Sequence, residues 1–237
     1  IPVDWIALTH PRYLADRAGL IGERSMGRAQ PGVPAGYTMT WAADEAQRIA
    51  TSHISAVDGF GNAVAMTSSI EDQFGARLMV RGFLLNNQLT DFSFAPGEDG
   101  KPVANRLQPG KRPRSSMAPT LVFDRAGGEL VATVGSPGGS LIIGYVARTL
   151  VGVLDWDLDI QQAISLANFG SRNGPTELER GRVDRGVVEA LRARGHEVRE
   201  IPMVSGLQGI VRVRLPDGRR AWAGGADPRR EGVALGD

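Results

Sequence analysis

The sequence of 237 residues contains no cysteine and only three histidines. The absence of cysteine excludes disulfide bonds, thiolate-bound metals and a cysteine nucleophile, and it leaves the redox compartment open. No apolar run approaches the roughly 20 residues that cross a bilayer as a helix. The formal charge of +1, from 27 basic and 26 acidic residues, gives no electrostatic bias towards polyanions. We therefore expect neither a nucleic-acid partner nor a membrane partner.

Several familiar catalytic signatures are also missing. The chain has no G-x-S-x-G elbow, no G-x-x-x-x-G-K-[ST] phosphate loop and no H-E-x-x-H metal helix. A Ser-His-Asp triad would have to be built around His53, whose neighbours are hydroxyl residues, and this stays open as one alternative. No set of residues requires a metal ion or an organic cofactor, so we expect neither.

The N-terminal quarter of the chain differs in character from the rest. The stretch THPRYLADRAGLIGER, from Thr9, predicts a short helix with Pro11 in its first turn. Residues 22–44 are rich in glycine and proline and predict an extended linker. Because the chain starts with Ile1 rather than methionine, we expect its start to be internal to a longer protein or a processed end.

Strand patterns dominate the middle of the chain and helical patterns follow them. Alternation over residues 51–69 around a turn at 58–62 predicts a β-hairpin. Further strands are predicted at 79–85, 120–123, 130–134, 198–203 and 210–215, and helices over 140–156, 160–167 and from Asp184 to Leu191. This order favours a layered α+β architecture over regular βαβ alternation.

Thr51 opens the predicted hairpin. A threonine hydroxyl is a weak nucleophile unless a base lies beside it, and the residue's own α-amino group is such a base once the chain is cut before it. Thr51 could attack the carbonyl of Ala50 to form an ester that water then cleaves, which frees that amine. The alternative is that threonine is simply a favourable strand residue.

Three further segments gather groups that could bind a polar substrate. In LLNNQLTDFS, the side chains of Gln88 and Asp91 follow a predicted strand, and the alternative is a turn rich in asparagine and aspartate. In KRPRSSMAPT, Ser115 and Ser116 lie in a loop stiffened by two prolines, where they could bind a carboxylate or merely form a turn.

The third segment, VGSPGGS, lies between a predicted strand and a predicted helix. Its glycines let the backbone approach a ligand closely, and free N–H groups at a helix start favour negative charge. Such donors stabilise the oxyanion of acyl transfer by roughly 3–4 kcal/mol each in favourable cases. A plain tight turn is the alternative, and the glycine spacing does not match a dinucleotide-binding fingerprint.

These segments, in this order, resemble the γ-glutamyltransferase (γ-glutamyltranspeptidase) family of the N-terminal nucleophile hydrolase superfamily. The segments that carry the resemblance are TSHISAVDGFGNAVAMTSS, FLLNNQLTDFS, KRPRSSMAPT, GSPGGS and GGADPRREG, with VDWIALTHPRYLADR before them. The resemblance implies an α+β, αββα four-layer sandwich, of which this chain is the C-terminal portion. It also implies that residues 1–50 are the C-terminal end of the large-subunit region, a helix plus linker, and that 51–237 form the small-subunit catalytic domain.

The resemblance also implies roles for individual residues. Thr51 would be the nucleophile after autocatalytic cleavage between Ala50 and Thr51, and the hydroxyl of Ser69 would contact it. By the same resemblance, Gly138 and Gly139 would form the oxyanion hole. Ser115 and Ser116 would bind the α-carboxylate of the substrate. Its α-ammonium would be bound by Glu71, Gln88 and Asp91. Glu71 stands where well-known members have asparagine.

The expected reaction is γ-glutamyl acyl transfer from glutathione-type donors to water or an amine, with no cofactor. Two alternatives stay open: a related acylase of glutaryl or cephalosporin type, and a non-catalytic, uncleaved assembly partner. The implied small-molecule partner is a γ-glutamyl compound. The implied protein partner is either the remainder of the large subunit, which is absent from this chain, or a second copy of this chain. The family's large subunit supplies an arginine that pairs with the substrate carboxylate. The implied location is periplasmic or extracellular.

Overall fold

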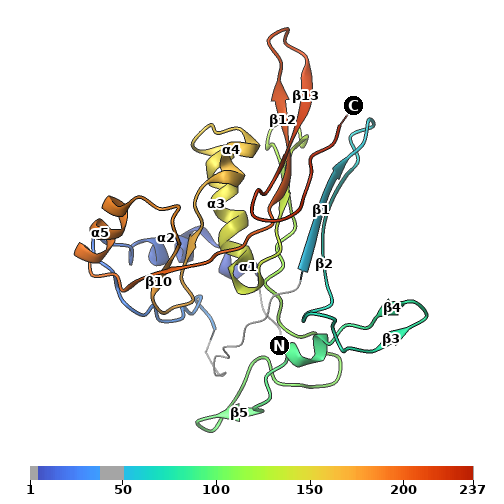
Figure 1. Cartoon of the computed structure of the whole chain (residues 1–237). Coiled ribbons are helices and arrows are strands. Elements are labelled where there is room, and N and C mark those ends of the chain that lie inside the picture. Colours follow the sequence, from blue (N-terminus) through green and yellow to red (C-terminus); the bar gives the residue numbers. More distant parts are fainter. Residues whose placement is uncertain (1–4, 38–50, 237) are drawn as a thin grey trace.

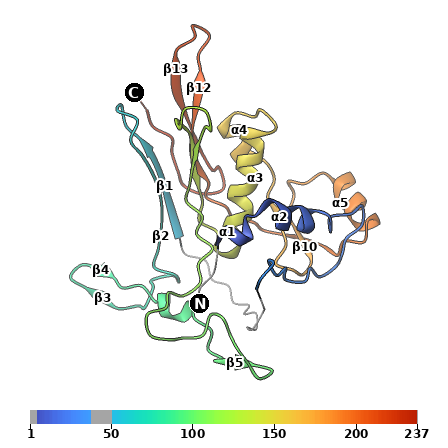
Figure 2. The same ribbon diagram turned by 180° about the vertical axis from the view of Figure 1, so that it is seen from behind.

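A computed structural model describes residues 5–37 and 51–236 of the chain. Its centre is a four-stranded antiparallel sheet in the order β13-β12-β8-β7, formed by Arg220–Ala226, Gln208–Arg214, Leu130–Gly135 and Thr120–Phe123. One face of this sheet packs against helices α3 (Ile142–Leu154) and α4 (Ile160–Ser165), and the other against the hairpin β1–β2 (Thr51–Val57 and Ala63–Ser69). Figures 1 and 2 show this order of layers from opposite sides.

The alternation along β8 explains why both of its faces are covered. Ala132 and Val134 belong to the apolar core against the helices, together with Ile142 and Ile164. The intervening Thr133 faces the hairpin instead, where its hydroxyl lies 3.1 Å from that of Ser55. β8 therefore belongs to a central sheet that is buried on both sides, which is the arrangement of a layered α+β fold.

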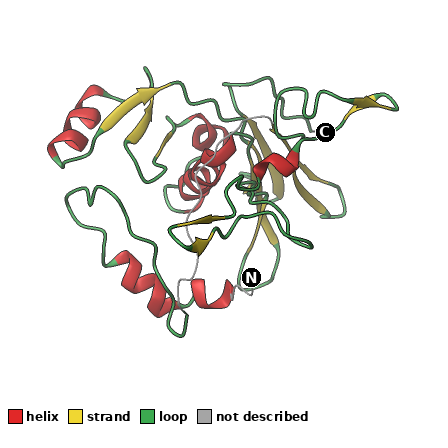
Figure 3. Cartoon of the chain, turned by 90° about the horizontal axis from the view of Figure 1, so that it is seen from below, coloured by secondary structure: helices red, strands yellow, loops and turns green. Residues whose placement is uncertain are grey.

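The remaining elements lie around this stack. Beyond the helices, α5 (Arg185–Ala193) accompanies a three-stranded sheet of β9 (Phe169–Gly170), β10 (Thr176–Glu179) and β11 (Val198–Ile201). Figure 3 shows α3 between this outlying sheet and the packed strands. Helices α1 (Trp5–Leu8) and α2 (Pro11–Ala18) lie on the same side of the molecule as α5. Among the described residues, no helix is both long and apolar enough to cross a membrane.

Most of the predicted elements are confirmed within a few residues. The hairpin, β7, β8, α3, α4 and α5 all form, and Asp184 caps α5 by accepting a hydrogen bond from the amide of Gly186 at 2.7 Å. The predicted strand at 79–85 is wrong as one element, because Arg81 and Gly82 both have positive φ and turn the chain. Two short paired strands result, β3 (Met79–Val80) and β4 (Phe83–Leu84).

Below the central stack, β3–β4 and the hairpin of β5 (Gly97–Glu98) and β6 (Lys101–Pro102) project from the body (Figure 1). Between them the 3₁₀ helix η1 (Gln88–Asp91) follows β4. A second 3₁₀ turn, η2 (Gly139–Leu141), connects β8 to α3. The start of β1, η1 and η2 all lie at this lower end of the stack, which is where polar side chains converge.

Candidate active site

The first two residues of the candidate site lie at the open end of the β1–β2 hairpin. Thr51 pairs with Ser69 in the register of the two strands, so that the two side chains stand on the same face. The Thr51 hydroxyl donates to Ser69 Oγ over 3.2 Å, and Ser69 Oγ also accepts the amide of Glu71 at 2.9 Å. Ser69 therefore holds the Thr51 hydroxyl and the start of the next segment together. Ala50 lies outside the described residues, so its bond to Thr51 is not part of this geometry.

Glu71 adopts a backbone conformation that few side chains tolerate. Its φ is +76°, in the left-handed region, where asparagine is enriched and glutamate is uncommon. The residue is 4% exposed, and its Oε2 atom accepts hydrogen bonds from Asn87 Nδ2 at 2.5 Å and from Thr90 Oγ1 at 3.3 Å. A strained backbone held by several side-chain contacts is typical of functional sites.

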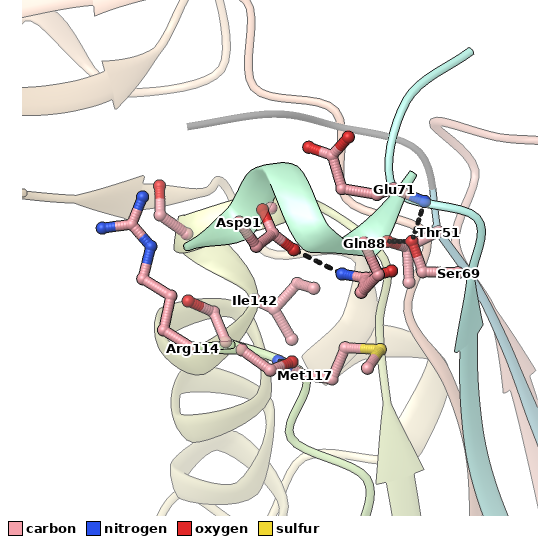
Figure 4. A pocket seen from close by; sticks show the side chains of 12 residues that line it. Thr51, Ser69, Glu71, Gln88, Asp91, Arg114, Met117 and Ile142 are labelled. Carbon is pink, nitrogen blue, oxygen red and sulfur yellow. Dashed lines mark hydrogen bonds between the residues drawn. The ribbon is translucent and has the colours of Figure 1, made fainter. Parts of the chain in front are cut away.

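The 3₁₀ helix η1 supplies two more polar side chains. A single turn separates Gln88 from Asp91, and the Gln88 amide donates to Asp91 Oδ2. Figure 4 shows this pair beside Thr51 and Ser69. The carboxylates of Asp91 and Glu71 thus give one part of the site negative charge, which suits a cationic group on a ligand.

The loop that carries Ser115 and Ser116 is fixed from behind by Asn105. The Asn105 side chain accepts the amide of Arg114 at 3.0 Å and donates to the carbonyl oxygen of Asp91 at 2.6 Å. Ser115 Oγ accepts the amide of Met117 at 3.2 Å and so forms a local turn. The predicted turn is thus present, and both serines line the pocket described below.

The turn between β8 and α3 requires its glycines. Gly138 has φ +141° and Gly139 has φ +61°, and a Cβ on Gly138 would lie 2.5 Å from Tyr145 Cε2. Ser136, which is fully buried, accepts the amide of Gly206 at 3.2 Å and anchors the segment before the turn. The backbone is therefore held in a shape that other residues could adopt only with strain.

These segments converge on one pocket, shown in Figure 4. It is lined by Thr51, Ser69, Glu71, Gln88, Asp91, Arg114, Ser115, Ser116, Met117, Gly139, Ser140 and Ile142. Every residue to which the resemblance assigns a role in the site is there except Gly138, which is next to Gly139 but does not line the pocket. Sequence reasoning missed Arg114, Met117, Ser140 and Ile142, although three of them adjoin a singled-out residue in the chain.

His53 does not belong to this pocket. Its ring lies between the hairpin and the central sheet, with Nδ1 2.8 Å from Thr67 Oγ1 and Nε2 3.1 Å from Ser55 Oγ. Burial lowers the pKa of His53 to about 4. With hydroxyls as its hydrogen-bond partners and no carboxylate among them, His53 lacks the surroundings of a triad histidine. Among the described residues, no cluster of three or more histidine, aspartate or glutamate side chains could hold a metal ion.

Comparison with known proteins gives a consistent set of relatives. Residues 2–237 match the family model described as gamma-glutamyltranspeptidase. The chain is 34% identical to the glutathione hydrolase proenzyme of Escherichia coli K12, over 97% of this chain and 39% of that protein. It is also 31% identical to an Acylase ACY 1 proenzyme of a Pseudomonas strain, over 71% of this chain and 29% of that protein.

Among solved structures, the chain resembles that of Helicobacter pylori gamma-glutamyltranspeptidase in its T380A mutant. The TM-score is 0.67 at 32% identity, with 75% of this chain and 99% of that chain covered. The α+β fold expected of this superfamily is therefore present. The chain spans only about 39% of the length of its Escherichia coli relative.

Proposed function

The chain belongs to the gamma-glutamyltranspeptidase family, and from this premise we propose that it carries the catalytic centre for γ-glutamyl transfer or hydrolysis, with Thr51 as nucleophile. The observation that carries the proposal is the hydrogen bond from the Thr51 hydroxyl to Ser69 in a pocket that also contains Gly139, Ser115 and Asp91. A nucleophile, backbone donors for an oxyanion and groups for a charged substrate are thus together.

Maturation comes first in the proposed sequence of events. The Thr51 hydroxyl attacks the carbonyl carbon of Ala50, and the peptide nitrogen leaves as the α-amine of Thr51, which gives an ester between the two residues. Water then hydrolyses the ester and releases Ala50 with a free carboxylate. The chain is divided into residues 1–50, the end of the large-subunit region, and residues 51–237, the catalytic domain. The relatives' name, proenzyme, supports such a step.

Catalysis then uses the groups that maturation exposes. The free α-amine takes the proton of the Thr51 hydroxyl as the oxygen attacks the γ-carbonyl of the donor, and the amine of the leaving group takes that proton. Backbone N–H groups of Gly138 and Gly139 stabilise the oxyanion. Water or an acceptor amine then attacks the acyl carbon, the ester bond to Thr51 Oγ breaks, and Thr51 Oγ regains its proton from the attacking group by way of the α-amine. Ser115 and Ser116 bind the donor's α-carboxylate, while Asp91, Gln88 and Glu71 bind its α-ammonium.

The acylase reaction of the Pseudomonas relative is the second candidate. A glutaryl group differs from a γ-glutamyl group in lacking the α-ammonium. Because two carboxylates, those of Glu71 and Asp91, line the pocket, the charges favour a donor that carries a cation. Parallel assays with γ-glutamyl-p-nitroanilide and glutaryl-p-nitroanilide separate the two reactions, and we expect the first to be the better substrate.

The proposed partner of the chain is the part of its relatives' length that it does not span, which is the remainder of the large subunit. On the outer face of the β1–β2 hairpin, Ile54 is 55%, Val64 51% and Met66 47% exposed. We place the remainder of the large subunit on this face, where it would supply the fourth layer of the αββα sandwich. A homodimer through the same face is the other arrangement, and the mass of the complex in solution distinguishes the two.

The proposal is tested by changing Thr51 in the full gene product. We expect Thr51→Ala to abolish both chain cleavage and turnover, because no hydroxyl remains to attack either carbonyl. Thr51→Ser keeps the hydroxyl and should retain part of both. Intact mass and N-terminal sequencing identify a fragment that begins at Thr51. Normal processing of the alanine variant would refute the mechanism, and an uncleaved wild-type chain would favour the non-catalytic alternative.

A further inference from the structure

The charged side chains of the pocket are distributed unevenly. Glu71 and Asp91 are anionic, and Arg114 is the one cation among the residues that line this pocket in the described part of the chain. In Figure 4, Asp91 and Gln88 lie between Arg114 and the Thr51–Ser69 pair. A ligand whose scissile carbonyl is at Thr51 would therefore meet the two carboxylates and the guanidinium at its other end.

The position of Arg114 relative to Asp91 is fixed by one side chain. Asn105 accepts the Arg114 amide through Oδ1 and donates to the Asp91 carbonyl through Nδ2. The loop before Arg114 is tied down as well, since Lys111 Nζ donates to the carbonyl oxygens of Ala104 and Arg106 at 2.6 and 3.1 Å. The backbones that carry the cation and the anion are therefore held in fixed register.

The presence of Arg114 and Asp91 in one pocket, on backbones joined through Asn105, matches the chemistry of an α-amino acid. The ammonium and carboxylate groups of such a ligand are joined through a single carbon, so their binding partners must also be neighbours. A guanidinium presents N–H donors in a planar fork that fits a carboxylate through two hydrogen bonds. Ser115, the next residue in the chain, lines the same pocket and carries a hydroxyl.

We propose that Arg114 is a specificity-determining residue that binds the α-carboxylate of the donor together with Ser115 and Ser116. The inference rests on the proposed function and adds a residue to it. The arginine that the family resemblance assigns to the carboxylate belongs to the large subunit, outside this chain. Arg114 supplies a second cation from the catalytic domain itself and makes the site depend more strongly on the donor's α-carboxylate.

The kinetic test uses Arg114→Ala and Arg114→Lys in the full gene product. The donors are γ-glutamyl-p-nitroanilide and its α-carboxamide, in which the carboxylate is neutralised. For Arg114→Ala we expect kcat/KM to fall roughly 10- to 100-fold on the first donor, mainly through KM, and less than about threefold on the second. Arg114→Lys should fall in between, because it keeps the charge but loses the fork.

Arg112→Ala is the matched control. Arg112 is exposed, lies two residues away in the same loop and does not line the pocket. We expect this variant to match the wild type on both donors. Equal losses on both donors for Arg114→Ala, or no loss on either, would overturn the assignment. A loss with glutathione but not with γ-glutamyl-p-nitroanilide would place the carboxylate on the leaving group and would also overturn it.

A binding measurement separates this inference from the proposed function. Calorimetric titration with L-glutamate and with L-isoglutamine, its α-amide, requires no turnover. We expect Arg114→Ala to weaken glutamate binding at least tenfold and to change isoglutamine binding little. If the wild type hydrolysed no γ-glutamyl donor, the proposed function would fail, yet this titration would still decide the role of Arg114. Wild-type protein with no preference for glutamate over isoglutamine would refute that role.

Discussion

Asp91 is the residue whose proposed role depends most directly on charge. If its carboxylate binds the donor's ammonium, Asp91→Asn should lower kcat/KM for γ-glutamyl-p-nitroanilide by an amount equivalent to roughly 2–4 kcal/mol, the range for losing one partner of a desolvated charge pair. Glutaryl-p-nitroanilide, which has no α-amino group, serves as the control donor. Steady-state kinetics on both donors provide the measurement. Equal losses would show that Asp91 only shapes the η1 turn.

Individual residues of the site were predictable from the sequence to different degrees. Thr51, Asp91 and Ser115 each belong to a compact motif, so short sequence segments were enough to single them out. Arg114 was missed because its role depends on Asn105, which joins it to Asp91 across the chain. Gly138 was expected in the pocket but does not line it, and a Cβ at this position would lie 2.5 Å from Tyr145 Cε2.

At the scale of elements, the hairpin and the central sheet meet through a buried histidine. Burial lowers the pKa of His53 from 6.5 to about 4. Between these values the unfolded chain takes up a proton that the folded chain does not, so folding stability is complete above about pH 6.5 and is lost as pH falls towards 4. The folding free energy lost through His53 as the pH falls from 6.5 to 4 is at most about 3 kcal/mol.

His53→Gln should remove this part of the pH dependence. Urea unfolding at several pH values between 5 and 7 gives the slope, and we expect it to be smaller in the variant. His10→Asn provides the control, because His10 is exposed and asparagine can replace it as the cap of α2. An unchanged slope in His53→Gln would show that other groups cause the acid sensitivity.

The loop of residues 95–111 bears on the competition between water and acceptor. It contains no aromatic side chain, its β5–β6 hairpin projects from the body (Figure 1), and none of its residues lines the pocket. A site that is not closed leaves the acyl-enzyme accessible to water. We expect hydrolysis to exceed transfer at millimolar glycylglycine. Mass spectrometry of the products decides this, and a dominant γ-glutamyl-glycylglycine product would show that another segment closes the site.

At the scale of the whole molecule, a buried ion-pair network joins the C-terminal segment to the outlying sheet. The Arg229 side chain is 6% exposed and contacts Glu179 at 2.6 Å and Asp227 at 3.1 Å. Asp227 in turn accepts the hydroxyl of Ser205 at 2.5 Å. Removing one member leaves buried charge without its partner, which commonly costs 3–5 kcal/mol.

Arg229→Met should therefore lower the free energy of unfolding by about 3–5 kcal/mol. Arg199→Met is the comparison, because the Arg199–Glu197 pair is solvent-exposed and exposed pairs contribute at most about 1 kcal/mol. Denaturant titration of both variants measures the difference. A loss for Arg229→Met no larger than that for Arg199→Met would mean that water reaches the network in solution.

Long-range pairing limits what the sequence could predict about the whole fold. β13 was not predicted, because the stretch RAWAGGA has three alanines and a glycine pair where strand patterns usually show branched side chains. It forms because β12 pairs with it along its full length. The parallel pairing of β10 with β11 also depends on distant residues and left no local pattern. The helices and the hairpin were predictable because their signals are local.

The tip of the β1–β2 hairpin has a consequence for insertions and deletions. Asp58 fixes the turn by accepting the amides of Phe60 and Asn62, each at 2.9 Å. Val57–Ala63 is the last of seven residue pairs and Thr51–Ser69 the first, about 20 Å away along the strands. A register shift caused by one added residue in the turn would bring Ser68 beside Thr51, and one caused by a lost residue would bring Ile70 there, so in both cases the Ser69 hydroxyl would point to the opposite face. Exposed hairpin tips usually tolerate changes in length. We expect this tip to tolerate them poorly, because the register set at the turn also determines which side chain lies beside Thr51, at the far end of the hairpin.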